Sequence, residues 1–213
     1  MCVGVQAGIL GWLDPTRADM VALLGEVTGA GMPLARLVSR IQLTDEGLQL
    51  LAQKPRITQS TLQYASTLPP GSFGYAYSQF MNSYGYSPAE RPNQIQFLED
   101  KEQEYVLQRY RQVHDLWHVL VGLPTSVEGE LAQKWFEFLQ TGLPLGALSV
   151  VIGQLKLGPV QIWRLNTIYI PWAFRCHFNC KFLLALRLEN RFPLPLEQVR
   201  KSLGIERAPV MSS

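Results

Sequence analysis

The sequence predicts an all-α protein, a single domain over residues 1–213 built as a bundle of mostly antiparallel helices. Helix-capping residues and helix-ending glycines and prolines recur along the chain. No segment of convincing length alternates apolar and polar residues, which is the pattern of a half-exposed strand. With 47% hydrophobic and 17% charged residues in 213, the chain has a globular composition and can bury one sizeable core.

Capping signals define the expected helices of the first half. Asp14-Pro15 is typical of an N-cap followed by proline at the first helical position, and Thr44 can cap a helix that stops before Pro55. The expected elements are a helix from Asp14 toward Thr28 that ends at Gly29, a helix from Thr44, short helices over residues 60–66 and 73–84, and a proline-rich loop over 87–94.

In the second half, two capping boxes open the central helices. Asp100 with Gln103 begins a long helix to about Val121, and Thr125 with Glu128 begins another that ends before Gly142. The remaining expectations are a helix over residues 144–155, a long apolar segment from 158 to about 191 with a kink at Pro171, a short helix from Pro195 to Gly204, and a frayed tail after residue 205.

The uncharged stretch over residues 138–155 approaches the length of a membrane span. Because it contains Gly142, Pro144 and Gly146, we expect two short buried helices instead. The N-terminus has neither a basic segment before its apolar run nor the arginine-rich and serine-rich composition of an organelle transit peptide. We therefore expect a cytoplasmic protein, with peripheral contact to the inner face of the membrane left open.

Charge and cysteine content exclude two classes of protein. A net charge of +2 gives no electrostatic basis for binding nucleic acid. Three cysteines are too few for a disulfide framework. Cys176, His177 and Cys180 suggest a second metal site by their spacing, although buried thiols in an apolar helix explain them as well.

The candidate chemistry lies in the segment HDLWH, residues 114–118. On a helix, His114 and His118 are one turn apart, about 6 Å along the axis, and Asp115 lies about 100° round from His114. Two histidines at positions i and i+4 suit one transition-metal ion. A satisfied polar patch on a helix surface is the alternative explanation of the same spacing.

A fourth ligand follows from the turn Gly122-Leu123-Pro124, which brings the next helix back antiparallel. Glu130 then lies near the level of His118. Two imidazoles and two carboxylates fit one divalent ion, zinc first, with magnesium, manganese or iron as alternatives. The predicted metal ligands are His114, Asp115, His118 and Glu130.

These residues, HDLWH followed by eleven residues and Glu130, resemble the HDxxHx11E motif of the Coq-four family of coenzyme Q (ubiquinone) biosynthesis. The flanking segments EYVLQRYRQVHDLWHVLVGLPT, GELAQKWFEFLQTGLP and YIPWAF are also similar, and the resemblance covers roughly residues 34–205. It implies an all-α fold and a zinc site. It also implies a role on a polyprenylated aromatic intermediate, whose ring carboxyl is removed oxidatively and replaced by hydroxyl, in contact with other quinone-biosynthesis enzymes.

Such a substrate predicts an apolar groove beside the metal. The candidate lipid-binding residues, for which core packing is the alternative, are Tyr77, Phe80, Met81, Trp117, Trp135, Phe138 and Leu139. Asp115 and Arg111 are the candidate catalytic residues. Asp115 lies within the HDLWH motif, and Arg111 lies on the helix face of the histidines, one turn before His114. Arg109 falls on the apolar side and therefore needs a carboxylate partner.

Three functions remain open from the sequence. The first is a metal-dependent oxidative decarboxylase of prenylquinone biosynthesis. The second is a non-catalytic scaffold that binds an isoprenoid lipid and presents it to partner enzymes. The third is a metal-dependent prenyl-phosphate hydrolase, although only His177 remains to complete its ligand set. A homodimer is compatible with each.

Overall fold

The computed structural model describes residues 26, 28–90, 95 and 98–209. Its elements, in chain order, are α3 Met32–Ile41, α4 Asp45–Gln53, α5 Gln59–Ser66, α6 Phe73–Tyr84, η1 Pro88–Glu90, α7 Lys101–Val121, α8 Val127–Thr141, α9 Pro144–Gly153, η2 Gln154–Lys156, α10 Pro159–Arg164, η3 Leu165–Tyr169, α11 Ile170–Asn179, η4 Leu183–Ala185, η5 Leu188–Arg191 and α12 Leu196–Leu203. Among these residues there is no strand, only an isolated bridge between Ser72 and Pro195. The predicted all-α class is therefore confirmed.

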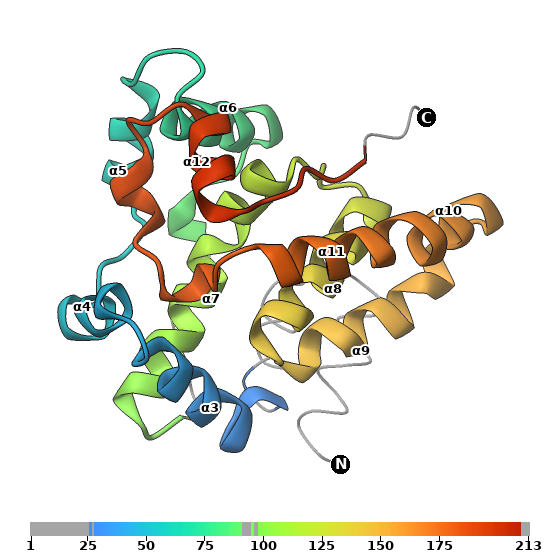
Figure 1. Cartoon of the computed structure of the whole chain (residues 1–213), viewed down its shortest axis with the longest axis horizontal. Coiled ribbons are helices and arrows are strands. Elements are labelled where there is room, and N and C mark those ends of the chain that lie inside the picture. The colour runs from blue at the N-terminus through green and yellow to red at the C-terminus, as the bar shows by residue number, and fades with distance from the viewer. Residues whose placement is uncertain (1–25, 27, 91–94, 96–97, 210–213) are drawn as a thin grey trace.

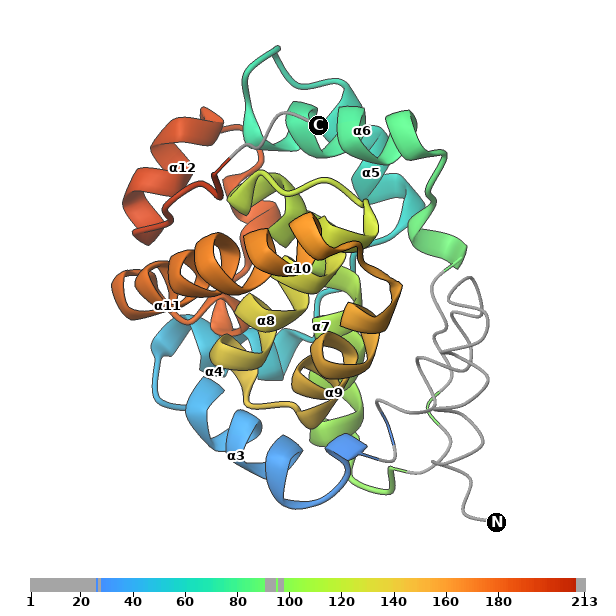
Figure 2. The same ribbon diagram turned by 90° about the vertical axis from the view of Figure 1, so that its right-hand side faces the viewer.

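Helix α7 forms the centre of the fold. Most of its residues are buried, because other helices pack around it: α3 and α6 contact it directly, and α8 returns beside it. Figures 1 and 2 place α5, α6 and α12 at one end of α7 and α3 and α4 at the other. Helices α9 and α11 pack on α8. One continuous cluster of buried apolar side chains joins these helices.

Capping chemistry explains most helix boundaries. The Thr44 side chain accepts a hydrogen bond from the Gly47 N–H and opens α4, and Asp100 accepts from two N–H groups and opens α7. Gly122 ends α7 with φ of 77°, a conformation that glycine adopts without strain. The one misplaced cap is that of α8, where Ser126 and not Thr125 accepts from the Gly129 N–H.

The segment after residue 158 differs from the predicted long, kinked helix. Pro171 has no N–H, so the chain cannot continue the regular hydrogen-bond ladder. It widens into the π-helical turn η3, where the Ile170 N–H reaches back to the Leu165 carbonyl. The helix then ends at Asn179, not near residue 191, and the Lys181 N–H donates to Leu203 of α12.

Residues 138–155 form parts of two helices, as predicted, because Gly142 takes φ of 68° and ends α8. The second helix is not buried as predicted, since Val151 and Leu155 are exposed. In the described part of the chain, no helix is both long enough and apolar enough to cross a bilayer.

The segment after residue 205 was predicted to be a frayed tail. As far as residue 208, it instead packs against the rest of the fold. The Trp172 indole donates to the Glu206 carbonyl at 3.0 Å, and the Ala208 N–H donates to Val121 at 2.8 Å. Ala208 is buried. These contacts attach the segment to α7 and α11. The predicted helix from Asp14 lies mostly outside the described residues; Thr28 and Gly29, at its expected end, are helical.

The buried arginine of α7 has the carboxylate partner that the sequence requires. Arg109 has no exposed surface and lies 2.6 Å from Glu189 through Nη2, which also donates to the Leu186 carbonyl at 3.1 Å. A buried charge of this kind is tolerated only when it is paired. The pair ties α7 to the C-terminal segment on the face away from the histidines.

Candidate metal centre

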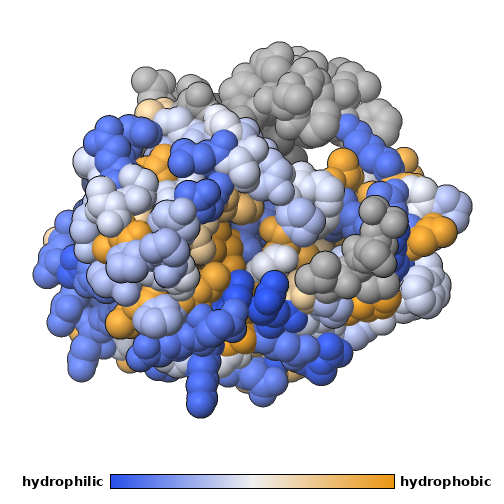
Figure 3. All heavy atoms as spheres, turned by 90° about the horizontal axis from the view of Figure 1, so that it is seen from above, coloured by the Kyte–Doolittle hydropathy of each residue, from blue (hydrophilic) through white to orange (hydrophobic). Residues whose placement is uncertain are grey.

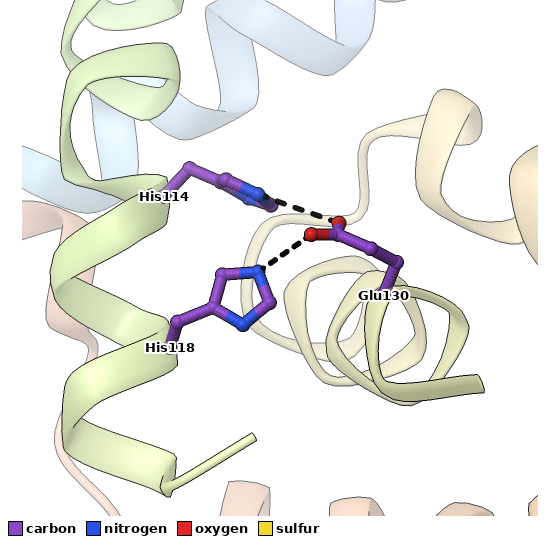
Figure 4. Close-up of side chains that lie close together, drawn as sticks. All are labelled: His114, His118 and Glu130. Atoms are coloured by element: carbon purple, nitrogen blue, oxygen red, sulfur yellow. Dashed lines mark ion pairs between the residues drawn. The ribbon is translucent and has the colours of Figure 1, made fainter. Parts of the chain in front are cut away.

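Helices α7 and α8 bring together two histidines and one glutamate (Figure 4). His114 and His118 project from consecutive turns of α7, and Glu130 reaches toward both from the first turn of α8. Glu130 Oε1 lies 3.1 Å from His118 Nε2, and Oε2 lies 3.5 Å from His114 Nε2. One ligand atom from each residue falls within 4.8 Å of the others. Glu130 therefore lies beside both histidines, as expected.

His118 is held by the turn that follows α7. Its Nδ1 lies 3.0 Å from the Leu123 carbonyl. A carbonyl only accepts, so Nδ1 carries the proton and Nε2 carries the lone pair. That Nε2 atom is buried and makes no hydrogen bond, although the Glu130 carboxylate faces it. Two facing lone-pair atoms are the arrangement that a cation between them would satisfy.

His114 is held by α8. Its Nδ1 lies 2.5 Å from Glu137 Oε1, so it too donates from Nδ1 and directs Nε2 at Glu130. A ligating histidine commonly donates its second N–H to a carboxylate or carbonyl in this way. Both histidines therefore have the orientation of metal ligands, independently of each other.

Charge balance around the site is built from buried groups. Burial alone would raise the pKa of Glu130, but its interactions with His114 and His118 hold that pKa well below the usual range. Burial opposes ionisation of Glu137 as well, yet the Lys134 ammonium and His114 lower its pKa. Lys134 is correspondingly held protonated, because Glu137 raises its pKa against the effect of burial. Both carboxylates are thus anionic.

The donor set fits a divalent transition metal. Two atoms bound tetrahedrally at about 2.0–2.1 Å from an ion lie about 3.3 Å apart. Glu130 Oε1 lies 3.1 Å from His118 Nε2 and Oε2 lies 3.5 Å from His114 Nε2, while the three ligand atoms together lie within 4.8 Å of one another. Three protein ligands leave at least one coordination position free, the pattern of catalytic zinc and of the two-histidine, one-carboxylate iron sites.

Asp115, also predicted as a ligand, is not among the three residues whose ligand atoms cluster. It is buried and borders a small space with Ile57, Tyr77 and Gln112, and its oxygens are not among the clustered ligand atoms. The reason is angular: residue 115 lies about 100° round the helix from residue 114, while α8 approaches on the histidine side. Arg111, predicted to assist at the metal, instead pairs with Glu26 at 3.1 Å.

The predicted lipid-binding residues divide into two groups. Tyr77, Met81 and Trp117 are fully buried in the core. The half-buried members lie at the edge of that core and are Phe80, Trp135, Phe138 and Leu139. The Phe80 ring stacks on the His118 imidazole, with centroids 5.4 Å apart and planes 23° apart. Phe80 therefore forms a wall of the candidate metal centre.

Sequence reasoning missed the residues behind His114. Glu137, Lys134, Gln133 and Tyr110 surround its Nδ1 side. Glu137 lies seven residues, almost two full turns, after Glu130, so the helical period places both on one face of α8. That spacing was the available signal.

The cysteines show no second ligand cluster within the described residues. Cys176 is buried and has a free thiol. The Cys180 thiol is also free, and its Sγ accepts a hydrogen bond from the Gln140 amide at 3.1 Å. His177 lies at the same place, 3.3 Å from the Gln140 amide. It is therefore not part of the candidate metal centre.

Comparison with known proteins finds one family. The family model described as "Coenzyme Q (ubiquinone) biosynthesis protein Coq4" matches residues 1–209. The mitochondrial ubiquinone biosynthesis protein COQ4 homolog of Bos taurus is 41% identical over 199 residues, 92% of this chain and 74% of the relative. The mitochondrial ubiquinone biosynthesis protein coq4 of Schizosaccharomyces japonicus is 36% identical over 208 residues, 97% and 87% of the two chains.

A protein of Nostoc punctiforme with a crystal structure has the same fold, with a TM-score of 0.74 and 20% identity over 94% of this chain and 96% of that one. The names of the Bos and Schizosaccharomyces relatives contradict the prediction of a cytoplasmic protein, since both are mitochondrial. That prediction used only the N-terminal composition, whereas the similarity spans nearly the whole chain.

Proposed function

Since the chain belongs to the Coq4 family of ubiquinone biosynthesis proteins, we propose that it acts in that pathway as a metal-dependent enzyme on a polyprenylated aromatic intermediate. The observation that carries this proposal is the convergence of His114, His118 and Glu130. Both imidazole Nδ1 atoms are hydrogen-bonded, to the Leu123 carbonyl and to Glu137, which leaves the Nε2 atoms for an ion. The names of the relatives also support a mitochondrial location.

His114, His118 and Glu130 would hold the ion, zinc by family resemblance or iron by the donor set. When bound, the ion supplies a positive centre that neutralises and orients the anionic ring carboxylate. Phe80, stacked on His118, offers an aromatic face to the ring. The half-buried Trp135, Phe138 and Leu139 offer apolar surface to the prenyl tail.

The reaction proposed is oxidative removal of the ring carboxyl. The bond from ring to carboxyl carbon breaks and carbon dioxide leaves. A carbon–oxygen bond forms at the same ring position, with water as the oxygen source. Two electrons and two protons pass to an oxidant, for which we propose dioxygen, reduced to hydrogen peroxide.

This reaction predicts release of labelled carbon dioxide by the purified protein from a short-chain prenylated aromatic acid labelled at the carboxyl carbon. Release should depend on added metal and dioxygen and fall at least 100-fold in His118→Ala, because a ligand is lost. Metal-loaded wild type that binds the acid but releases no label would contradict catalysis and favour the scaffold alternative. The hydrolase alternative has no further support, because His177 lies apart from the cluster.

An apolar arm, defined here as the exposed hydrophobic residues of α9, η2, α10 and α11, supports contact with a membrane, where a polyprenyl lipid resides. Its members are Val151, Leu155, Val160, Ile162, Trp163, Phe174 and Phe178. Figure 3, seen from above, shows apolar side chains interspersed with hydrophilic ones at the right-hand end, where Figure 1 places α10. Exposed apolar groups on neighbouring elements mark a candidate interaction surface.

Charged substitutions in the apolar arm are expected to weaken vesicle binding. Leu155 is 75% and Trp163 59% exposed, and burying each in lipid contributes about 1.5–3 kcal/mol. In flotation with phosphatidylcholine and phosphatidylglycerol vesicles, Leu155→Glu and Trp163→Glu should each lower the partition coefficient about tenfold or more. Leu43→Glu is the matched control, because Leu43 is 81% exposed in the α3–α4 connection. Equal losses in all three would mean that the arm has no special role.

A further inference from the structure

Glu137 of α8 is the centre of a buried hydrogen-bond group behind the candidate metal centre. Its carboxylate has no exposed surface. It accepts from four side chains: Oε1 from His114 Nδ1 (2.5 Å) and Gln133 Nε2 (3.2 Å), and Oε2 from Lys134 Nζ (2.7 Å) and the Tyr110 hydroxyl. A carboxylate has about four lone-pair sites, so these donors use its capacity in full.

This group fixes the state of His114. An ionised carboxylate cannot donate, so the proton of a neutral His114 imidazole lies on Nδ1 and the lone pair on Nε2. Gln133 lies against the same side of the ring, with its Nε2 3.3 Å from His114 Nδ1. The same Nε2 donates to the His114 backbone carbonyl at 2.8 Å, which holds the amide in place. The lone pair is thereby directed toward Glu130, whose carboxylate lies on the Nε2 side.

Lys134 balances the charge. A buried carboxylate is costly without a counterion, and the Lys134 ammonium lies 2.7 Å from Glu137 Oε2 and 3.4 Å from His114 Nδ1. Lys134 and Glu137 thus offset each other's charge beside His114, whose neutral imidazole is the form that would ligate a metal.

We propose that Glu137 is a positioning residue of the metal centre, which holds the Nδ1–H of His114 so that Nε2 faces the ion, with Lys134 as its counterion. This inference rests on the proposed metal centre. In the described part of the chain, Glu137 is the carboxylate that contacts a Nδ1 atom of the motif histidines, since His118 Nδ1 faces the Leu123 carbonyl instead.

A buried ion pair that only stabilises the fold would have the same burial and charge. Helix α7 offers a matched example in Arg109, fully buried and 2.6 Å from Glu189. That pair does not contact either histidine. A substitution at Arg109 or Glu189 therefore removes a buried ion pair without disturbing a candidate metal ligand. It serves as the control for substitutions of Glu137.

The test measures zinc affinity of the purified full-length protein by competition with a chromogenic chelator, beside thermal unfolding in EDTA. Glu137→Gln should bind zinc 10–100-fold more weakly, the usual effect of losing a partner of a ligating histidine. The double variant Lys134→Met with Glu137→Gln removes the charge together with its counterion. It should recover stability but not affinity. Glu189→Gln should lower the melting temperature and leave zinc affinity within about twofold of wild type.

The metal-free protein gives an independent measurement. Two-bond ¹H–¹⁵N correlation spectra report the His114 tautomer, which should be Nδ1-protonated in wild type and mixed in the double variant. An unchanged tautomer there, or zinc affinity equal to wild type in a folded double variant, would overturn the role of Glu137. Failure of wild type to bind zinc while the tautomer changes as expected would instead count against the proposed metal centre.

Discussion

His118→Ala is expected to lower zinc affinity more than about 100-fold. The loss should exceed the 10–100-fold range of residues that only orient a ligand, because one of three clustered ligand atoms is removed. The fold should tolerate the change, since among the described residues the side chain gives up one hydrogen bond, to the Leu123 carbonyl. Elemental analysis after gel filtration and chelator competition would measure the effect, with circular dichroism to confirm the helical content.

Asp115→Asn provides the matched comparison, because Asp115 lies in the same motif and is buried but stands outside the cluster. Its zinc affinity should fall less than that of His118→Ala. An equal loss would return Asp115 to the ligand set, and a wild-type level of zinc in His118→Ala would contradict the site.

Helix boundaries were predictable where the signal is local. Thr44, Asp100 and Gly122 act through hydrogen bonds or backbone angles within one turn of their helix, so the sequence alone carries the information. Helix α3 was missed, because it begins after Gly31 without a side-chain cap. Its buried Leu34, Leu37 and Ile41 nevertheless follow the helical period.

The wrong boundary near residue 191 has a non-local cause. Apolar residues continue past Asn179, and nothing in that composition announces a helix end. The chain leaves the helix to pair with a segment more than twenty residues later, through the Lys181 N–H and the Leu203 carbonyl. Such a contact exists only in the folded chain.

The candidate site was predictable as far as helical spacing reaches. The period of α7 and the tight turn after it bring His114, His118 and Glu130 together, as the structure has them. The side on which α8 packs is a tertiary property. It leaves Asp115 outside the cluster of ligand atoms and places Glu137 against His114. The spacing of Glu137 from Glu130 puts both on one face of α8, but only the packing of α8 on α7 brings the Glu137 carboxylate against His114.

Trp117→Ala is expected to destabilise the fold by about 3–5 kcal/mol, the usual cost of truncating a buried aromatic residue to alanine. Trp117 is 0% exposed and packs edge-on against Tyr110 and Phe136 at centroid distances of 6.4 and 6.0 Å. Its indole N–H has no hydrogen-bond partner, so packing alone provides its contribution. At roughly 2–4 °C per kcal/mol for a chain of this size, the melting temperature should fall by roughly 10 °C.

The comparison of Trp117→Ala with Trp163→Ala separates core packing from lipid contact. Trp163 is 59% exposed on the apolar arm, so its truncation leaves no cavity and should change the free energy of unfolding by less than about 0.5 kcal/mol. Vesicle binding should show the reverse order, with Trp163→Ala impaired and folded Trp117→Ala near wild type. Loss of vesicle binding in Trp117→Ala without destabilisation would instead place Trp117 in the lipid groove, and α7 would then have to open for the substrate. The first result is the expected one because Trp117 of α7 packs against Phe136 of α8, and it therefore stabilises the helix pair that carries the candidate metal ligands.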